Sequence, residues 1–218
     1  MKVNTDGVLL GAWSTSKNAR KVLDIGTGCG VIALMLCQGS DSIQVAGIEI
    51  HKESVLQARY NVANSPYKTQ IKIELGDFTK FDFGDQRFDL IISNPPFFTA
   101  GSLPSSDKKQ ISKHQTSLTI ESLIKKSTSL LSDQGKINIV VPFHQLNQVK
   151  ESVAQNGLSI HHRTDVKSFA DSDPFNVMLE LGFINNVSMH HDSLVIYAAR
   201  NQYTLQYIEL VKPYYLHM

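Results

Sequence analysis

The chain has few cysteines, no long apolar run and almost no net charge. Its 218 residues include two cysteines, Cys29 and Cys37, with no ligand-type His or Cys partners beside them. Two such residues neither build a disulfide framework nor suit a zinc site, so the sequence predicts no metal and favours a reducing, cytoplasmic setting. The N-terminus has no apolar signal segment and no run reaches membrane-spanning length, so no membrane segment is expected.

The charge balance also lacks a feature of many nucleic-acid-binding proteins. With 21 Lys and Arg against 20 Asp and Glu, the net charge is +1, well short of overall basicity. Basic residues do gather locally, at Lys108-Lys109 with Lys113-His114, at Lys125-Lys126 and at His161-His162-Arg163. A hydrophobic content of 42% suits a single domain over residues 1–218. The oligomeric state stays open, with a monomer as the expectation.

Short apolar runs alternate with helix-like stretches between Lys21 and Val141. The predicted strands are Lys21–Ile25, Gln44–Ile50, Ile71–Leu75, Phe88–Ser93 and Ile137–Val141. The predicted helices are Val31–Cys37, Glu53–Asn64, Ile120–Leu131 and Phe143–Asn156. This alternation is typical of βαβ units, so the sequence predicts an α/β fold with a parallel sheet covered on both faces.

The pattern becomes strand-rich beyond Gly157, without helical crossovers, and predicts antiparallel pairs. The predicted strands there are Leu158–Val166, Val177–Phe183 and Leu194–Ala198, before a helix-like stretch at Gln202–Val211. Two irregular regions, Phe98–Thr116 and Lys167–Asn176, separate predicted elements. Long loops in a compact domain are usually functional or disordered.

A glycine-rich loop follows the first predicted strand, with the sequence Asp24-Ile25-Gly26-Thr27-Gly28-Cys29-Gly30. Glycines between a strand and a helix allow a tight turn and let a ligand approach the backbone closely. The Gly-x-Gly-x-Gly spacing differs from the Gly-x-Gly-x-x-Gly of dinucleotide enzymes, which argues against a bound pyrophosphate. We therefore favour a nucleotide or nucleoside ligand over a purely structural turn.

Acidic residues stand at the ends of the next two predicted strands. By analogy with nucleotide-binding folds, Glu49 is placed to accept hydrogen bonds from both hydroxyls of a ribose. Gly76-Asp77-Phe78 offers a carboxylate and a ring to an adenine base, although Asp77 could equally cap a turn. Ligands of open α/β sheets bind beyond the carboxyl ends of the strands, so these acids and Asp24 predict one site. S-adenosylmethionine is the favoured cofactor.

The motif Asn94-Pro95-Pro96-Phe97 ends the fourth predicted strand. An amide oxygen and a proline-rigid carbonyl can both accept from one NH2 group, while the aromatic ring can stack on the base that carries it. Two acceptors draw the delocalised lone pair back toward sp3, so positioning and electrostatics suffice without a strong base. The motif predicts methylation of a planar nitrogen such as adenine N6, and by itself it also reads as a turn.

These motifs, in this order, resemble the Rossmann-like class I methyltransferases. The resemblance implies a mostly parallel seven-stranded sheet of order 3-2-1-4-5-7-6, with strand seven antiparallel and helices on both faces. Residues 1–13, the strand end Arg163-Thr164-Asp165-Val166 and the terminal Tyr214-Tyr215-Leu216 are similar to the bacterial tRNA1(Val) (adenine(37)-N6)-methyltransferases. That family methylates, with S-adenosylmethionine, the adenine immediately 3′ of the anticodon.

The resemblance also implies roles for individual residues. The implied cofactor-binding residues are Asp24, Gly26, Gly28 and Gly30 for the methionine part, Glu49 for the ribose, and Asp77 with Phe78 for the adenine. Thr5 and Asp6 are further cofactor candidates, because the opening segment of the family lies over the cofactor; a turn and a helix start are the alternative. The implied catalytic residues that hold the target base are Asn94, Pro95, Pro96 and Phe97.

The expected partner is the anticodon loop of a tRNA, whose target base must leave its stack. The basic loop after the motif would contact it through Lys108, Lys109, Lys113 and His114. Relatives commonly show Ala-Arg-His or Ala-Arg-Tyr where this chain has Ser112-Lys113-His114, and Lys lacks the bidentate fork of Arg. They also usually carry more chain before residue 1, which predicts weaker RNA binding here.

Three alternatives remain open from the sequence. The same motif serves glutamine-N5 protein methyltransferases, which usually have Tyr at its fourth position and a separate N-terminal helical domain. Ribosomal RNA or DNA amino-methylation would use the same chemistry. A protein that binds S-adenosylmethionine and RNA without turnover is the alternative outside the enzymes.

Overall fold

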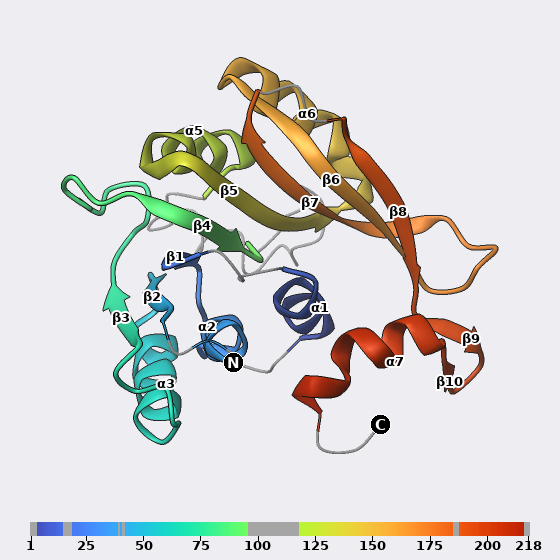
Figure 1. Cartoon of the computed structure of the whole chain (residues 1–218), viewed down its shortest axis with the longest axis horizontal. Helices are drawn as coiled ribbons and strands as arrows, with labels where there is room; N and C mark the ends of the chain where they lie inside the picture. Colours follow the sequence, from blue (N-terminus) through green and yellow to red (C-terminus); the bar gives the residue numbers. More distant parts are fainter. Residues whose placement is uncertain are drawn as a thin grey trace, which may run out of the picture.

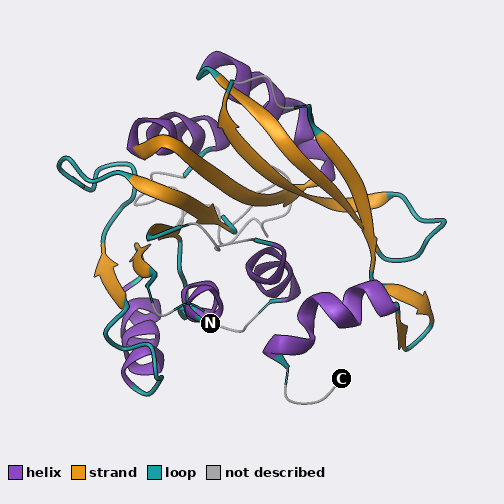
Figure 2. Cartoon of the chain, viewed as in Figure 1, coloured by secondary structure: helices purple, strands orange, loops and turns teal. Residues whose placement is uncertain are grey.

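The computed structural model describes residues 4–14, 19–38, 40, 42–95, 118–184 and 188–215. A twisted sheet crosses the molecule, with helices on both of its faces (Figures 1 and 2). The strands, in sheet order, are β3 (Ile71–Leu75), β2 (Gln44–Glu49), β1 (Lys21–Ile25), β4 (Phe88–Ser93), β5 (Leu131–Pro142), β7 (Pro174–Phe183), β6 (Leu158–Lys167) and β8 (His190–Val195). Neighbouring strands are parallel except at β7, which is antiparallel to both β5 and β6.

The predicted fold class and order of the first seven strands are confirmed, and the sheet gains an eighth strand. The strand predicted at Leu194–Ala198 is divided between β8 and β9 (Tyr197–Ala199), and the antiparallel pairing expected for it is wrong for β8. The strand β8 begins four residues earlier, at His190, and runs parallel to β6 at the edge of the sheet. Residues 190–193 are all exposed, because an edge strand needs few apolar side chains, and apolar periodicity therefore could not reveal it.

Helices cover the two faces of the sheet. The helices α1 (Thr5–Trp13), α2 (Val31–Cys37), α3 (Lys52–Ala63) and α7 (Leu205–Val211) lie on one face, and α5 (Ile120–Leu130) and α6 (Leu146–Gln155) lie on the other (Figure 1). The helix predicted from Phe143 begins with a 3-10 turn, η1 (Phe143–Gln145). The stretch predicted as helical from Gln202 starts instead with β10 (Gln202–Tyr203), which pairs with β9 (Tyr197–Ala199) before Thr204 caps α7.

Each face of the sheet has its own apolar core. Val22, Leu90 and Ile92 belong to the core beneath α1, α2, α3 and α7, whereas Leu23 and Ile91, one position along, belong to the core beneath α5 and α6. Such alternation is what a strand with two covered faces produces. The predicted strands read as continuous apolar runs for this reason.

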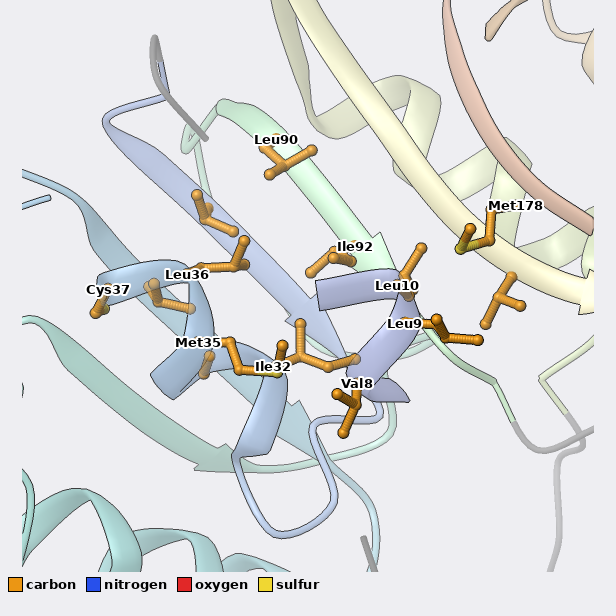
Figure 3. Packing of buried hydrophobic residues seen from close by; sticks show 14 of the residues in the cluster. Val8, Leu9, Leu10, Ile32, Met35, Leu36, Cys37, Leu90, Ile92 and Met178 are labelled. Atoms are coloured by element: carbon orange, nitrogen blue, oxygen red, sulfur yellow. The ribbon is translucent and has the colours of Figure 1, made fainter. Parts of the chain in front are cut away.

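The helix α1 is packed firmly beneath the end of β4. Val8, Leu9 and Leu10 are at most 5% exposed and lie against side chains of α2 and β4 in the same core (Figure 3). At the far end of α1, Trp13 Nε1 donates to the Thr164 hydroxyl of β6 at 2.9 Å. The middle of α1 and its C-terminal end are thus held, which restricts where its first turn lies.

A chain of polar contacts extends from Thr164 to the edge strand β8. The Thr164 hydroxyl donates to Asp192 of β8 at 2.5 Å, and the Asp192 carboxylate lies 3.3 Å from the ring nitrogens of both His162 and His190. The ligand-type atoms of these two histidines and Asp192 lie within 4.8 Å of one another. The carboxylate already pairs with both rings, so hydrogen bonds account for the cluster.

Among the described residues, no helix has the length and apolar character needed to cross a membrane.

Candidate active site

The glycine loop between β1 and α2 is held from beneath by Asp24. This side chain is fully buried, and its Oδ2 accepts a hydrogen bond of 2.6 Å from the Thr27 hydroxyl. Burial raises the pKa of Asp24 to about 7, helped by the charge of Glu49, while bonds from Thr27 and from the backbone of Ala33 act in the opposite direction. The structure thus places the Asp24 carboxylate as a support of the loop.

The backbone of the loop adopts conformations that favour glycine. Gly26, Gly28 and Gly30 have φ angles of 69°, 58° and 83°, in the left-handed region. A Cβ atom added at Gly26 would meet none of the described residues within 4 Å, whereas one at Gly30 would lie 3.4 Å from the Cβ of Ala58 in α3. The loop is therefore packed on its α3 side and open at Gly26, where a ligand could approach the backbone.

Glu49 lies at the end of β2 and is 7% exposed. Its Oε2 accepts from the Gly28 N–H at 3.1 Å, and its Oε1 accepts from the His51 N–H at 2.9 Å. These bonds tie the carboxylate to the glycine loop and fix its orientation. Each oxygen can accept more than one hydrogen bond, so capacity for ribose hydroxyls remains.

Asp77 follows β3 and forms the turn that was the alternative prediction for it. Its Oδ1 accepts from the backbone N–H and the hydroxyl of Thr79, at 2.9 and 2.7 Å. The neighbouring Phe78 ring is 5% exposed and packs 6.0 Å from the Phe83 ring. The structure places this ring in the core below the turn, so a ligand at the sheet edge would meet the backbone of residues 77–78 and the carboxylate.

Asn94 follows the last residue of β4, which is locked to β1 by a bond of 2.9 Å from the Ser93 hydroxyl to the Ile25 carbonyl. Asn94 is half-buried, and its Nδ2 donates to Asn4 Oδ1 at 3.1 Å. The same Asn4 oxygen accepts from the Gly7 N–H at 2.9 Å. Because a backbone N–H can only donate, the Asn4 atom must be oxygen, and the Asn94 atom facing it must be the NH2 group. The Asn94 amide oxygen is therefore turned away from Asn4.

Thr5 and Asp6 form the first turn of α1, capped by Asn4. Thr5 is exposed, and Asp6 is half-buried and hydrogen-bonded to Asn176 near the start of β7. Burial raises the pKa of Asp6, and the bond to Asn176 partly offsets that rise. The structure thus shows the helix start, and it brings this turn to the side of Asn94.

The strands bring these groups to one edge of the sheet. Ile25 of β1 is paired with Ile48 of β2 and with Ser93 of β4, and Glu49 is paired with Leu75 of β3. Since the four strands are parallel, the glycine loop, Glu49, Asp77 and Asn94 all follow their carboxyl ends. The edge combines an open backbone loop, fixed carboxylates and an oriented amide.

Comparison with known proteins identifies this arrangement. Residues 6–155 match the methyltransferase small domain family. The chain is 37% identical over 219 residues to the tRNA1(Val) (adenine(37)-N6)-methyltransferase of Bacteroides thetaiotaomicron, covering 100% of this chain and 92% of that protein. It is 37% identical to the protein of the same name from Trichodesmium erythraeum, covering 99% and 91%. The chain belongs to the tRNA1(Val) (adenine(37)-N6)-methyltransferase family.

A solved structure supports the fold of this family member. A protein from Agrobacterium tumefaciens, described as a predicted O-methyltransferase, superposes with a TM-score of 0.74 over 95% of this chain and 96% of that one. Its sequence identity is 14%, so the likeness concerns the fold alone. The family resemblance and the Rossmann-like methyltransferase fold predicted from the sequence are confirmed.

Several predicted site residues are not described by the structure. Pro95 is buried, but Pro96 and Phe97 of the motif lie outside the described residues. The same holds for all four predicted RNA contacts, Lys108, Lys109, Lys113 and His114. Their roles in this family member remain predictions.

The structure adds three residues that the sequence analysis missed. Asn4 contacts Asn94, and Asn176 contacts Asp6. Nothing local in the sequence marks either contact. Ile50, directly after Glu49, is an exposed aliphatic side chain at this edge of the sheet, with 44% of its surface accessible. An apolar residue immediately beyond the acid at a strand end was a usable signal for Ile50.

Proposed function

We propose that the protein transfers a methyl group from S-adenosylmethionine to N6 of adenine 37 in tRNA1(Val). The names of its relatives support this substrate. The observation that carries the proposal is the Asn94 amide, whose NH2 group is engaged by Asn4 and whose oxygen is consequently directed elsewhere. An oxygen acceptor at the end of β4 is what a planar amine requires.

The glycine loop and Glu49 fit the cofactor. The open side of Gly26 leaves room for a ligand against the backbone, and the fixed Glu49 carboxylate has lone pairs left for the ribose hydroxyls. Asp77 and the exposed Ile50 would flank the adenine. S-adenosylmethionine supplies an electrophilic methyl group when it is bound, and these residues orient it.

The residues after β4 act on the target nitrogen. The Asn94 oxygen and the Pro95 carbonyl would each accept one hydrogen of the adenine NH2 group, which draws the nitrogen lone pair out of the ring and toward the methyl carbon. The nitrogen loses its extra proton readily once it is alkylated, so orientation matters more than a strong base. Asn4 holds the Asn94 amide in the required orientation before the substrate arrives.

Adenine 37 lies beside the anticodon, in a loop whose bases can leave their stack. A protein that modifies a base must extract it into a pocket, and this costs least where the base is unpaired. We expect the loop after the motif to contact the RNA through Lys108, Lys109, Lys113 and His114, in the cytoplasm and as a monomer. Phosphate contacts of this kind predict binding that weakens with salt.

The test uses purified protein, labelled S-adenosylmethionine and two transcripts. One transcript is unmodified tRNA1(Val) with adenine at position 37, and the other has guanine at that position. We expect label in N6-methyladenosine from the first transcript alone, identified by mass spectrometry of the nucleosides. Equal labelling of both transcripts would reject position 37, and label found on protein glutamine would favour the alternative methyltransferase class.

A further inference from the structure

The side chain of Lys126 on α5 is directed at the turn that follows β3. Lys126 is half-buried, unlike its neighbour Lys125, which is exposed. Its Nζ donates a hydrogen bond of 2.7 Å to the Phe81 carbonyl. The same ammonium lies 5.3 Å from the centroid of the Phe78 ring and 5.5 Å from that of the Phe83 ring. A charge-assisted hydrogen bond and two cation–π contacts thus hold one ammonium group in place.

The turn from Asp77 to Phe81 connects this anchor to the edge of the sheet where the candidate active site lies. The Phe81 N–H donates to the Asp77 carbonyl at 2.8 Å. A Cβ atom added at Gly76 would lie 2.7 Å from the Phe81 ring, so this ring packs directly on the backbone that precedes Asp77. The Gly76 N–H in turn donates to the Glu49 carbonyl at 2.9 Å. The position of Asp77 therefore depends on Phe81, which Lys126 holds.

The charges around Lys126 include those of the turn itself. Burial lowers the pKa of Lys126, whereas the negative charges of Asp77 and Asp82 act in the opposite direction. Lys80 also lies near the turn, with its Nζ 3.5 Å from Asp77 Oδ2, but its side chain is 69% exposed and water screens that pair. Lys126 is therefore held in this turn more firmly than Lys80.

The two lysines of the Lys125-Lys126 cluster lie in different surroundings. The sequence groups them as local basic residues, and phosphate contacts are made by ammonium groups at the surface. Lys125 is exposed on α5, whereas the ammonium of Lys126 faces the Phe81 carbonyl and the rings on the face of the sheet opposite α3 (Figure 1). The structure therefore separates Lys126 from its neighbour and assigns it to the turn.

We propose that Lys126 is a positioning residue for the adenine of S-adenosylmethionine, because it holds the turn from which the Asp77 carboxylate accepts a hydrogen bond from the exocyclic amine of that base. This inference rests on the proposed function, in which Asp77 flanks the adenine. A carboxylate oxygen must lie within about 3 Å of the amine nitrogen to accept from it, so a turn free to shift would lose this contact. Lys126 acts through Asp77 and needs no contact of its own with the cofactor.

The experiment titrates the full chain calorimetrically with two ligands. S-adenosylhomocysteine carries the exocyclic amine, whereas S-inosylhomocysteine carries a carbonyl oxygen in its place, which cannot donate to a carboxylate. Wild-type protein should bind the first ligand about 10-fold or more tightly than the second, because the second lacks a hydrogen bond to a charged group. Lys126→Met keeps the aliphatic stem and removes the ammonium. It should weaken binding of S-adenosylhomocysteine at least about fivefold and change that of S-inosylhomocysteine by less than about twofold.

Two further variants distinguish positioning from stability. Lys126→Arg keeps a cation that can donate to the Phe81 carbonyl, so its preference for the adenine ligand should lie within about threefold of wild type. Asp77→Ala removes the acceptor and should itself abolish the preference. Adding Lys126→Met to Asp77→Ala should then change the preference by less than about twofold, because the group that Lys126 positions is gone.

Lys125→Met provides the matched control, because it removes the exposed ammonium of the neighbouring residue, and both affinities should equal those of wild type. A lower melting temperature in Lys126→Met with an unchanged preference for the adenine ligand would overturn the inference and leave Lys126 a role in stability alone. Weaker tRNA binding with an unchanged preference would overturn it in favour of an RNA contact. Equal binding of the two ligands by wild-type protein would overturn it as well.

The titrations need no RNA, so the inference and the proposed function can fail separately. Wild-type protein that prefers the adenine ligand but does not methylate the tRNA transcript would reject the proposed substrate. The comparison of Lys126→Met with Lys125→Met would still decide the role of Lys126.

Discussion

Replacing Asn94 by alanine removes the side-chain acceptor that we place opposite the adenine NH2 group. The native amide does not have to find its orientation during the reaction, because Nδ2 is bonded to Asn4 Oδ1 at 3.1 Å and that oxygen is fixed by the Gly7 N–H at 2.9 Å. A preoriented group of this kind acts mainly on the transition state. The Asn94 side chain bonds Asn4, whereas Glu49 bonds Gly28 and His51, so cofactor binding should survive.

The expected loss of catalytic rate is much larger than the expected loss of folding stability. Losing one preoriented hydrogen bond to a transition state typically lowers kcat about 100- to 1000-fold. Within the described part of the chain, the fold loses the bond between Asn94 and Asn4, which is worth about 0.5–1.5 kcal/mol because the site is half-exposed. For a chain of this length, that corresponds to a fall in melting temperature of about 1–6 °C. Activity should therefore collapse while the protein remains folded.

The assay combines single-turnover methylation of the tRNA transcript with calorimetric titration of S-adenosylhomocysteine. We expect Asn94→Ala to show a rate at least about 100-fold below wild type and an unchanged dissociation constant for the cofactor product. Asn64→Ala is the matched control, because Asn64 is an exposed amide that bonds the Tyr60 carbonyl in its own helix. Wild-type turnover in Asn94→Ala would refute the assigned role, and equal losses of rate and cofactor affinity would move Asn94 to the cofactor site.

Four further predictions concern the cofactor side of the edge. Burial raises the pKa of Asp24 from 3.8 to about 7, so the folded state binds the proton more tightly than the unfolded state. The free energy of unfolding should therefore fall as pH rises from about 4 to 7. Asp24→Asn should remove this pH dependence, which amounts to up to about 4 kcal/mol, when unfolding is measured in urea. Glu49→Gln removes a charge that accepts ribose hydroxyls and should weaken cofactor binding about 10-fold or more by calorimetry, whereas unchanged affinity would exclude a ribose contact. Gly26→Ala should lower the free energy of unfolding by about 1 kcal/mol, because alanine is strained at a φ of 69°. The added methyl group would also lie on the open side of the loop, so the free energy of cofactor binding should fall by more than the free energy of unfolding. Asp77→Ala should weaken cofactor binding, and the same titration giving wild-type affinity would remove this residue from the site.

Local sequence predicted much of the fold because buried parallel strands need continuous apolar runs. The strands β1, β3 and β4 have the bounds expected from such runs, and α2 begins where the glycine loop ends. The first four residues of β8 escaped prediction because they are exposed at an edge, where no apolar pattern is required. After β7 the chain crosses to the free edge of β6 and pairs there in parallel. No local sequence pattern encodes that path.

The candidate site divides in the same way. The sequence by itself determined the types and order of the chemical groups: a glycine loop, acids at strand ends and an amide before two prolines. Only the tertiary structure decided how these groups are oriented. It buried the Asp24 carboxylate and the Phe78 ring, and it brought Asn4 against Asn94 across 90 positions of the chain. Hydrogen-bond direction depends on partners that meet only after the sheet and α1 have packed, whereas motif chemistry depends on covalent neighbours alone.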